Sequence, residues 1–143
     1  MNKKIIIISI LASVLMSAAI YGYYIKNNKE SKIYLMQIGA YKNYDNVLKN
    51  TKDVSNYFVF KENDLYKVFI GVAASDEAYT KLLNIYGNDY NSYKKTINLS
   101  DKDLESKIIK YDSLINKVKT KEEIDLIVKE EIKMISDVFE ETI

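Results

Sequence analysis

The chain has 143 residues and contains no cysteine, histidine, arginine, proline or tryptophan. Without cysteine it can form no disulfide, thiol nucleophile or thiolate metal site. Without histidine it has no imidazole base near neutral pH and no histidine-based metal site. Its acidic residues form no recognisable motif for glycoside cleavage. We therefore expect a protein that is not an enzyme and that uses no cofactor and no metal.

The absence of arginine leaves lysine as the only basic residue type, and the formal net charge of the whole chain is +1. Nucleic-acid-binding proteins usually carry a marked excess of positive charge on one face or segment. The near-neutral total gives no indication of such a partner, so we expect no nucleic acid.

The one long apolar run lies near the N-terminus, where residues 5–25 include no charged side chain. A run of this length matches the roughly 20 residues that cross a hydrocarbon core of ~30 Å. Tyr21, Tyr23 and Tyr24 gather at its C-terminal end, as in the aromatic belt of a membrane interface. The pattern predicts a membrane anchor over residues 1–25, with the uncharged run as the transmembrane span.

A cleaved signal peptide is the alternative for this segment, because Ser17–Ala19 is an acceptable small-residue cleavage signal. The apolar run continues past it to Ile25, which favours an anchor. The compact charges of Lys3 and Lys4 favour a cytoplasmic N-terminus. We therefore expect a single-pass protein of the cell membrane, with an extracellular C-terminal domain held close to the bilayer by a short tether at residues 26–32.

Between residues 32 and 100 the apolar pattern predicts six elements in the order strand, helix, strand, strand, helix, strand. That order is typical of a ferredoxin-like sandwich, an α+β fold in which two helices cover one face of a four-stranded antiparallel sheet. Asn43 and Ser75 are the expected N-caps, and Gly87 is expected to end the second helix in the left-handed conformation. The strands are expected at residues 32–41, 57–61, 65–73 and 92–100, and the helices at 43–56 and 76–87.

Alternation along the strands assigns side chains to the two faces of this sheet. One face is expected to pack under the helices, and the other to be open to solvent. An open sheet that bears glutamine, lysine and aromatic rings is a reasonable platform for a polymer. The residues expected under the helices are Tyr34, Met36, Ile38, Tyr66, Val68 and Ile70, and those expected on the open face are Leu35, Gln37, Lys67, Phe69 and Gly71.

Two short stretches carry a resemblance to a known family. The stretch "YLMQIGAY" at residues 34–41 precedes the first helix, and "LYKVFIG" at residues 65–71 precedes the second. The SPOR domain of bacterial cell-envelope proteins has a strand reading roughly V-Q-x-G-[SA]-[FY] and a later strand reading [YW]-R-V-x-x-G. The chain resembles this family over residues 33–100, with both motifs at the family's separation.

The resemblance implies a ferredoxin-like domain that binds peptidoglycan at glycan strands stripped of their stem peptides, as at division or sporulation septa. The family's glycan-contacting glutamine falls on Gln37, its small residue on Ala40, and its basic residue in the third strand on Lys67. Sugar rings would lie on aromatic side chains, while glutamine would donate to and accept from their polar groups. The rings that could take this part are Phe69, Tyr57 and Tyr93.

Residues 101–143 contain two amphipathic patterns, which predict a helical hairpin. Ser100 is the expected N-cap of the first helix, and Thr120 with Glu123 is expected to form a capping box at the second. The apolar stripes are expected either to pack on each other and on the sandwich, or to bind a partner helix or a second copy. These stripes are Leu104, Ile108, Tyr111, Ile115 and Val118, and then Ile124, Ile127, Val128, Ile132, Ile135 and Phe139.

The leading prediction of function is a membrane-anchored, non-catalytic protein of the bacterial cell envelope that binds denuded peptidoglycan strands. The alternative is a structural adaptor with a degenerate SPOR fold, whose helical tail recruits a protein partner. The residue pattern by itself also allows Gln37 to be an exposed residue of an ordinary sheet. A tail packed over the open sheet would block the glycan platform.

Overall fold

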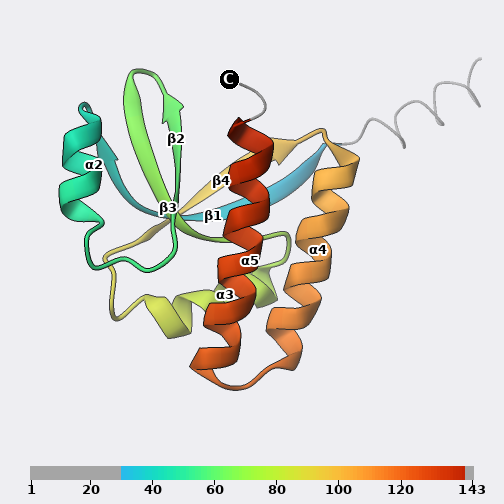
Figure 1. The fold of residues 1–143 in the computed structure, drawn as a ribbon. Helices are drawn as coiled ribbons and strands as arrows, with labels where there is room; N and C mark the ends of the chain where they lie inside the picture. Colours follow the sequence, from blue (N-terminus) through green and yellow to red (C-terminus); the bar gives the residue numbers. More distant parts are fainter. Residues whose placement is uncertain (1–29, 141–143) are drawn as a thin grey trace, which may run out of the picture. The chain divides into compact units, whose positions relative to one another are not determined.

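The computed structural model describes residues 30–140, in which four strands and four helices form an α+β unit with a helical C-terminal part (Figure 1). The expected membrane span at residues 5–25 lies outside the described residues. Within residues 30–140, no helix has both the length and the apolar character needed to cross a membrane. The strands are β1 (Ser31–Tyr41), β2 (Phe58–Glu62), β3 (Leu65–Ala73) and β4 (Tyr93–Leu99), and the helices are α2 (Tyr44–Asn50), α3 (Asp76–Tyr86), α4 (Lys102–Lys117) and α5 (Lys121–Glu140).

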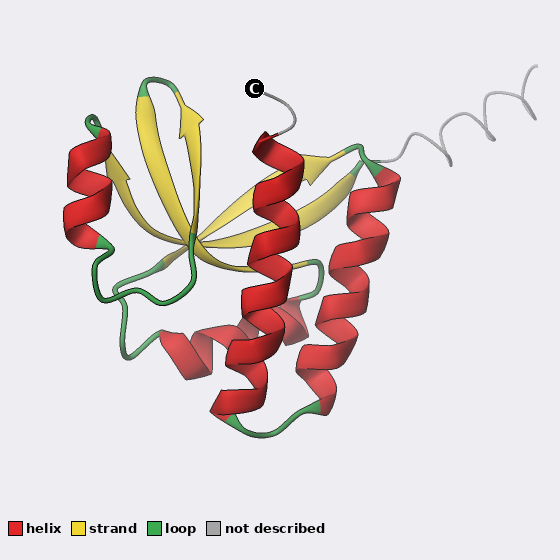
Figure 2. Ribbon diagram, in the orientation of Figure 1, coloured by secondary structure: helices red, strands yellow, loops and turns green. Residues whose placement is uncertain are grey.

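The four strands form one antiparallel sheet in the order β2-β3-β1-β4 (Figure 2). The predicted four-stranded antiparallel sheet is therefore confirmed, and β3 has the predicted bounds. These segments form strands because β-branched and aromatic residues favour a pleated, half-buried surface. Asn63 and Asp64 connect β2 to β3 with positive φ angles of 51° and 60°. Such angles at both central residues are typical of the two-residue type I′ hairpin turn.

The end of α2 and the residue after α3 differ from their predictions. Helix α2 ends at Asn50, and Thr51 is its C-cap residue, with a hydroxyl that donates to the carbonyl oxygen of Val47 at 2.8 Å. The predicted extension of this helix to residue 56 is therefore wrong. Gly87 follows α3 in the right-handed conformation, with φ at −66°, so its predicted left-handed conformation is also wrong.

The predicted N-terminal caps are confirmed only in part: Asn43 occupies the N-cap position of α2, but its side chain makes no capping hydrogen bond. The hydroxyl of Ser75 accepts a hydrogen bond at the start of α3, as predicted. Thr120 and Glu123 form the predicted capping box, in which each side chain accepts from the other residue's backbone N–H. Asp101, not Ser100, caps α4, because its carboxylate accepts from two N–H groups of the first turn.

A bulge interrupts the pairing of β1 with β3. Met36 pairs with Gly71, whereas Gln37 pairs with Phe69, so Ile70 is an extra residue on β3. The extra residue places Gly71 and Phe69 on opposite faces, and the prediction that they share a face is wrong. A Cβ added at Gly71 would lie 3.2 Å from a side-chain carbon of α3, so glycine lets this helix approach the sheet closely.

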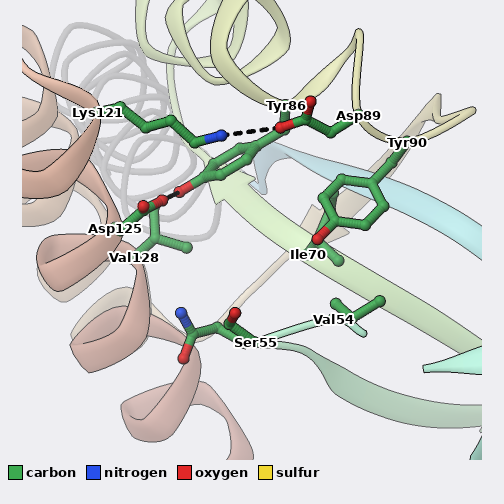
Figure 3. Close-up of a pocket in the computed structure, with 10 residues that line it drawn as sticks. Val54, Ser55, Ile70, Tyr86, Asp89, Tyr90, Lys121, Asp125 and Val128 are labelled. Atoms are coloured by element: carbon green, nitrogen blue, oxygen red, sulfur yellow. Dashed lines mark hydrogen bonds and ion pairs between the residues drawn. The ribbon is translucent and has the colours of Figure 1, made fainter. Parts of the chain in front are cut away.

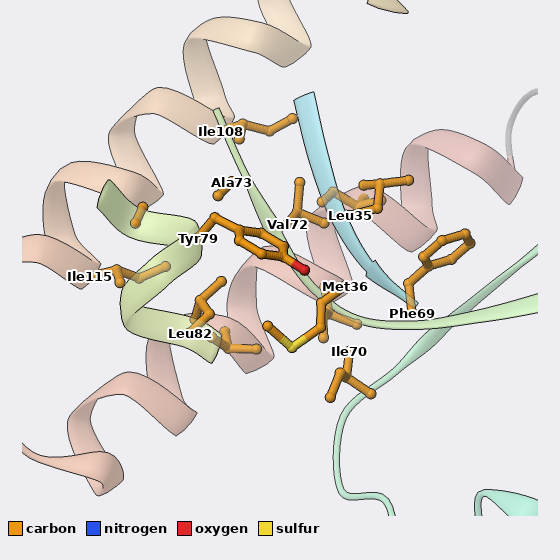
Figure 4. Close-up of a cluster of buried hydrophobic side chains, with 14 of the residues drawn as sticks. Leu35, Met36, Phe69, Ile70, Val72, Ala73, Tyr79, Leu82, Ile108 and Ile115 are labelled. Carbon is orange, nitrogen blue, oxygen red and sulfur yellow. The ribbon is translucent and has the colours of Figure 1, made fainter. Parts of the chain in front are cut away.

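Helices cover both faces of the sheet. Helices α2 and α3 lie on the face of Met36 and Gly71, whereas α4 and α5 contact β3 and β2 from the other face. In Figure 1, α4 and α5 run side by side, and α5 crosses in front of the strands. The apolar stripes of α4 and α5 thus pack on each other and on the sandwich, which was the first of the two alternatives predicted for them. Their buried members, part of the core drawn in Figure 4, are Leu104, Ile108, Ile115, Ile124, Val128, Ile132 and Ile135.

Candidate functional site

The four residues predicted to contact glycan lie on one face of the sheet. Gln37 on β1 pairs with Phe69 on β3, and Ala40 on β1 pairs with Lys67 on β3. Directly paired residues in an antiparallel sheet point to the same side. Lys67 and Phe69 are two residues apart on β3, so both pairs share a side. The sheet therefore brings these four residues together, on the face that α4 and α5 contact.

This face is only partly open. Gln37 is 0% exposed and Phe69 is 1% exposed, whereas Ala40 is exposed and Lys67 is half-buried. The expectation that Gln37 and Phe69 lie on an open surface is wrong, because the helical tail covers that half of the sheet. Leu35 is buried on the same face for the same reason. The half that remains accessible lies toward the β2–β3 turn.

Gln37 has local structural contacts within the irregular part of β1. Its side-chain amide nitrogen donates to the carbonyl oxygen of Gly39 at 3.1 Å, within the second irregularity in the pairing of β1 with β3. Its amide oxygen is buried and has no hydrogen-bond partner among the described residues. An unpaired buried acceptor costs free energy, so a purely structural role does not explain all of this side chain.

Phe69 belongs to the core beneath the tail. Its ring stacks on Phe58 of β2 with centroids 5.1 Å apart and an interplanar angle of 23°. Both rings are buried, on the two strands that α5 contacts. The position that sequence reasoning assigned to sugar stacking therefore holds an anchor for the helical tail.

Three charged side chains meet on the accessible half of this face. The ammonium groups of Lys67 on β3 and Lys95 on β4 each donate to the same carboxylate oxygen of Glu62 on β2. We call Glu62, Lys67 and Lys95 the lysine cluster. Strands β2 and β4 are the two edges of the sheet, so a direct ion pair between them requires that the sheet curl toward this face. In Figure 1 the sheet is strongly twisted, and the β2–β3 hairpin runs at a steep angle to β4.

The electrostatics of the lysine cluster keep its carboxylate ionised. Hydrogen bonds from Lys67 and then Lys95 lower the pKa of Glu62 to about 2. The hydrogen bond to Glu62 in turn raises the pKa of Lys67. The carboxylate of Glu62 is therefore ionised at neutral pH, and it is shared by two lysine side chains. Sequence reasoning found Lys67, but it missed Glu62 and Lys95 because only the curl of the sheet brings the two edges together.

Aromatic rings flank the lysine cluster. Phe60 on β2 pairs with Lys67, and Tyr93 on β4 pairs with Gln37, so both rings belong to the same face. Tyr93 is 54% exposed and Phe60 is 37% exposed. The accessible half of the face thus offers two rings, two ammonium donors and one carboxylate acceptor. Such a surface can stack sugar rings and bind their hydroxyl and acetamido groups.

The helical tail also buries two carboxyl groups. Asp112 on α4 accepts three hydrogen bonds through one oxygen, from the backbone N–H groups of Ala74 and Ser75 and from the Ser75 hydroxyl, at 2.8 to 3.0 Å. Glu131 on α5 is 0% exposed, and neither of its oxygens has a hydrogen-bond partner among the described residues. Burial, followed by the nearby Asp112, raises the pKa of Glu131 well above its ordinary value. This shift favours the protonated, uncharged form of Glu131.

Within residues 30–140, no group of three or more acidic side chains is arranged to hold a metal ion. Comparison with known proteins adds nothing to this geometry: no family model matches the chain, and neither a curated protein nor a solved structure does. Any assignment of function therefore depends on the site itself and on the resemblance of its two motifs.

Proposed function

We propose that this chain is a non-catalytic, membrane-anchored protein of the bacterial cell envelope that binds peptidoglycan at denuded glycan strands. The proposal includes a ferredoxin-like sandwich of the SPOR type, for which the sheet order β2-β3-β1-β4 and two helices on one face are the support. It also includes an anchor at residues 5–25 and a role at division or sporulation septa, which the resemblance implies.

The observation that carries the proposal is the lysine cluster between exposed aromatic rings. Tyr93 and Phe60 supply apolar ring faces on which the C–H face of a sugar can lie. Lys67 and Lys95 supply donors, and Glu62 supplies an acceptor. An extended strand of sugars needs no deep pocket, so a curled, partly open sheet is sufficient. Of the four residues that sequence reasoning named, Lys67 and Ala40 stay in the proposed contact surface, and Gln37 and Phe69 support it from below.

A pulldown of the full-length chain with purified sacculi tests this function. We expect retention to increase after amidase treatment has removed stem peptides. A double substitution of Lys67→Ala and Lys95→Ala should reduce retention about tenfold, because it removes both ammonium donors. Lys129→Ala with Lys133→Ala is the matched control, since it removes the same charge from exposed positions of α5. Equal and negligible retention of the folded wild type before and after amidase treatment would reject the proposal.

A structural adaptor is the second candidate, and one observation favours it. The tail buries Gln37 and Phe69, two positions at which the resemblance places glycan contacts. An adaptor would need no sugar surface, and its partner would bind the outward faces of α4 and α5. In the pulldown above, an adaptor predicts no amidase-dependent retention of the wild type. In cells, its localisation would be sensitive to the control pair on α5 and insensitive to the pair on the sheet.

A further inference from the structure

A pocket of about 260 Å³ lies away from the lysine cluster, between the C-terminal end of α3, the first half of α5 and the segment that follows α2 (Figure 3). Its apolar part is made by Val54, Ile70 and Val128. This volume is slightly below the usual range for drug-sized ligands, which is about 300 to 1,000 Å³. The pocket therefore suits a small group or the end of one side chain.

The polar part of the pocket contains two carboxylates and one ammonium group. Lys121 lies 2.8 Å from a carboxylate oxygen of Asp89, and the hydroxyl of Tyr86 donates to Asp125 at 2.5 Å. Figure 3 shows these two interactions converging from α5 and from the end of α3. Each interaction uses one carboxylate oxygen, so the second oxygen of each group can accept a further hydrogen bond. The pocket carries one more negative charge than positive.

We infer that this pocket binds a primary ammonium group at the end of a short aliphatic chain, the chemistry of a lysine side chain. The two carboxylates would accept its N–H donors, and Tyr90 is among the residues that line the pocket. Its methylene groups would lie on the apolar part of the pocket. This inference is independent of the proposed glycan surface.

The chain's own Lys121 already shows that a primary ammonium is accepted at this position. Its pKa is raised, first by the hydrogen bond to Asp89 and then by the charges of Asp89 and Asp125. Lys121 and Asp89 are each about half exposed, at 51% and 50%. An ion pair this exposed is typically worth only about 0 to 1 kcal/mol, so a ligand that also fills the apolar part can displace Lys121.

Saturation-transfer NMR of the full-length chain with Nα-acetyl-lysine methylamide tests this inference. We expect saturation of the ε-methylene protons of this probe and none for the Nα,Nε-diacetyl analogue, which lacks the ammonium charge. Asp125→Asn should weaken binding about tenfold while keeping an acceptor for the Tyr86 hydroxyl. Asp137→Asn makes the same change at an exposed position further along α5 and should have no effect.

Lys121→Gln gives the sharpest outcome, because removal of the internal competitor should tighten binding about threefold. Were Lys121 a merely structural residue, the substitution would weaken binding or leave it unchanged, and either result would overturn the inference. Equal saturation of the two probes, or no saturation at millimolar probe, would overturn it too. If Asp125→Asn fails to fold, Asp89→Asn removes the other carboxylate and carries the same expectation.

Discussion

The helices on the two faces of the sheet, α3 on one and α4 with α5 on the other, differ in the chemistry of their contacts. On one face, Leu82 of α3 comes close to Gly71 in an apolar contact, and Asp76 at the start of α3 accepts hydrogen bonds from Tyr34 and Lys94. On the other face, α4 and α5 also bury apolar stripes. Gln37 and Glu131 are buried on this face too, and the side-chain oxygens involved, one on Gln37 and both on Glu131, have no hydrogen-bond partner among the described residues. Unpaired buried oxygens cost free energy that apolar contacts do not.

The helical tail is held by apolar burial, and that stabilisation is reduced by the cost of its unpaired polar groups. Natural proteins tend to keep such groups where they serve a function. Here the unpaired polar groups lie on the same face of the sheet as the proposed glycan surface. We therefore expect the helical tail to be the part of the unit that opens first.

The largest effect is expected for Phe69→Ala, which should lower the free energy of unfolding by about 3 to 5 kcal/mol, because it removes a buried ring and leaves a cavity. Phe60→Ala is the matched control on the same face. Its ring is 37% exposed, so its loss should be about 1 kcal/mol or less. Urea denaturation followed by circular dichroism measures both. Equal losses would contradict the placement of Phe69 beneath the tail.

Next in size is Leu82→Ala, for which we expect a loss of about 2 to 5 kcal/mol, since this side chain is 0% exposed between α3 and the sheet. The neighbouring Leu83 is 40% exposed, and Leu83→Ala should change stability by much less. The same denaturation experiment applies. A small effect of Leu82→Ala would contradict the burial of this side chain between α3 and the sheet.

A smaller and pH-dependent effect is expected for Glu131→Gln. A carboxyl group with a raised pKa in the folded state holds its proton while the unfolded chain releases it, so stability decreases as pH rises above the unfolded pKa of about 4.5. Removal of this titration should stabilise the protein at pH 8 and have little effect at pH 4. Denaturation curves at the two pH values check this. A variant whose advantage does not grow with pH would contradict the burial of an unpaired Glu131.

Local features of the fold could be predicted well from the sequence. Alternating β-branched and aromatic residues marked all four strands, and the caps at Ser75 and Thr120 each depend on residues within one turn. The extra residue at Ile70 could not be predicted, because a bulge depends on the register between two strands that are distant in sequence. It changed the face assigned to Gly71.

The candidate site was predictable only in part, for a related reason. Strand alternation placed Gln37, Lys67 and Phe69 on one face, but the exposure of that face depends on where the tail packs. An amphipathic stripe shows that a helix must bury one side, without showing against what. The charge pair between Glu62 and Lys95 likewise requires the curl of the whole sheet.

Hydrogen–deuterium exchange of the full-length chain, with and without denuded glycan strands, tests the central claim most directly. The account predicts slower exchange in the β2–β3 hairpin around Phe60 and Lys67 and at the start of β4 around Tyr93 and Lys95, with no protection of the outer faces of α4 and α5. Slower exchange confined to α4 and α5, or no change anywhere at saturating glycan, would contradict it.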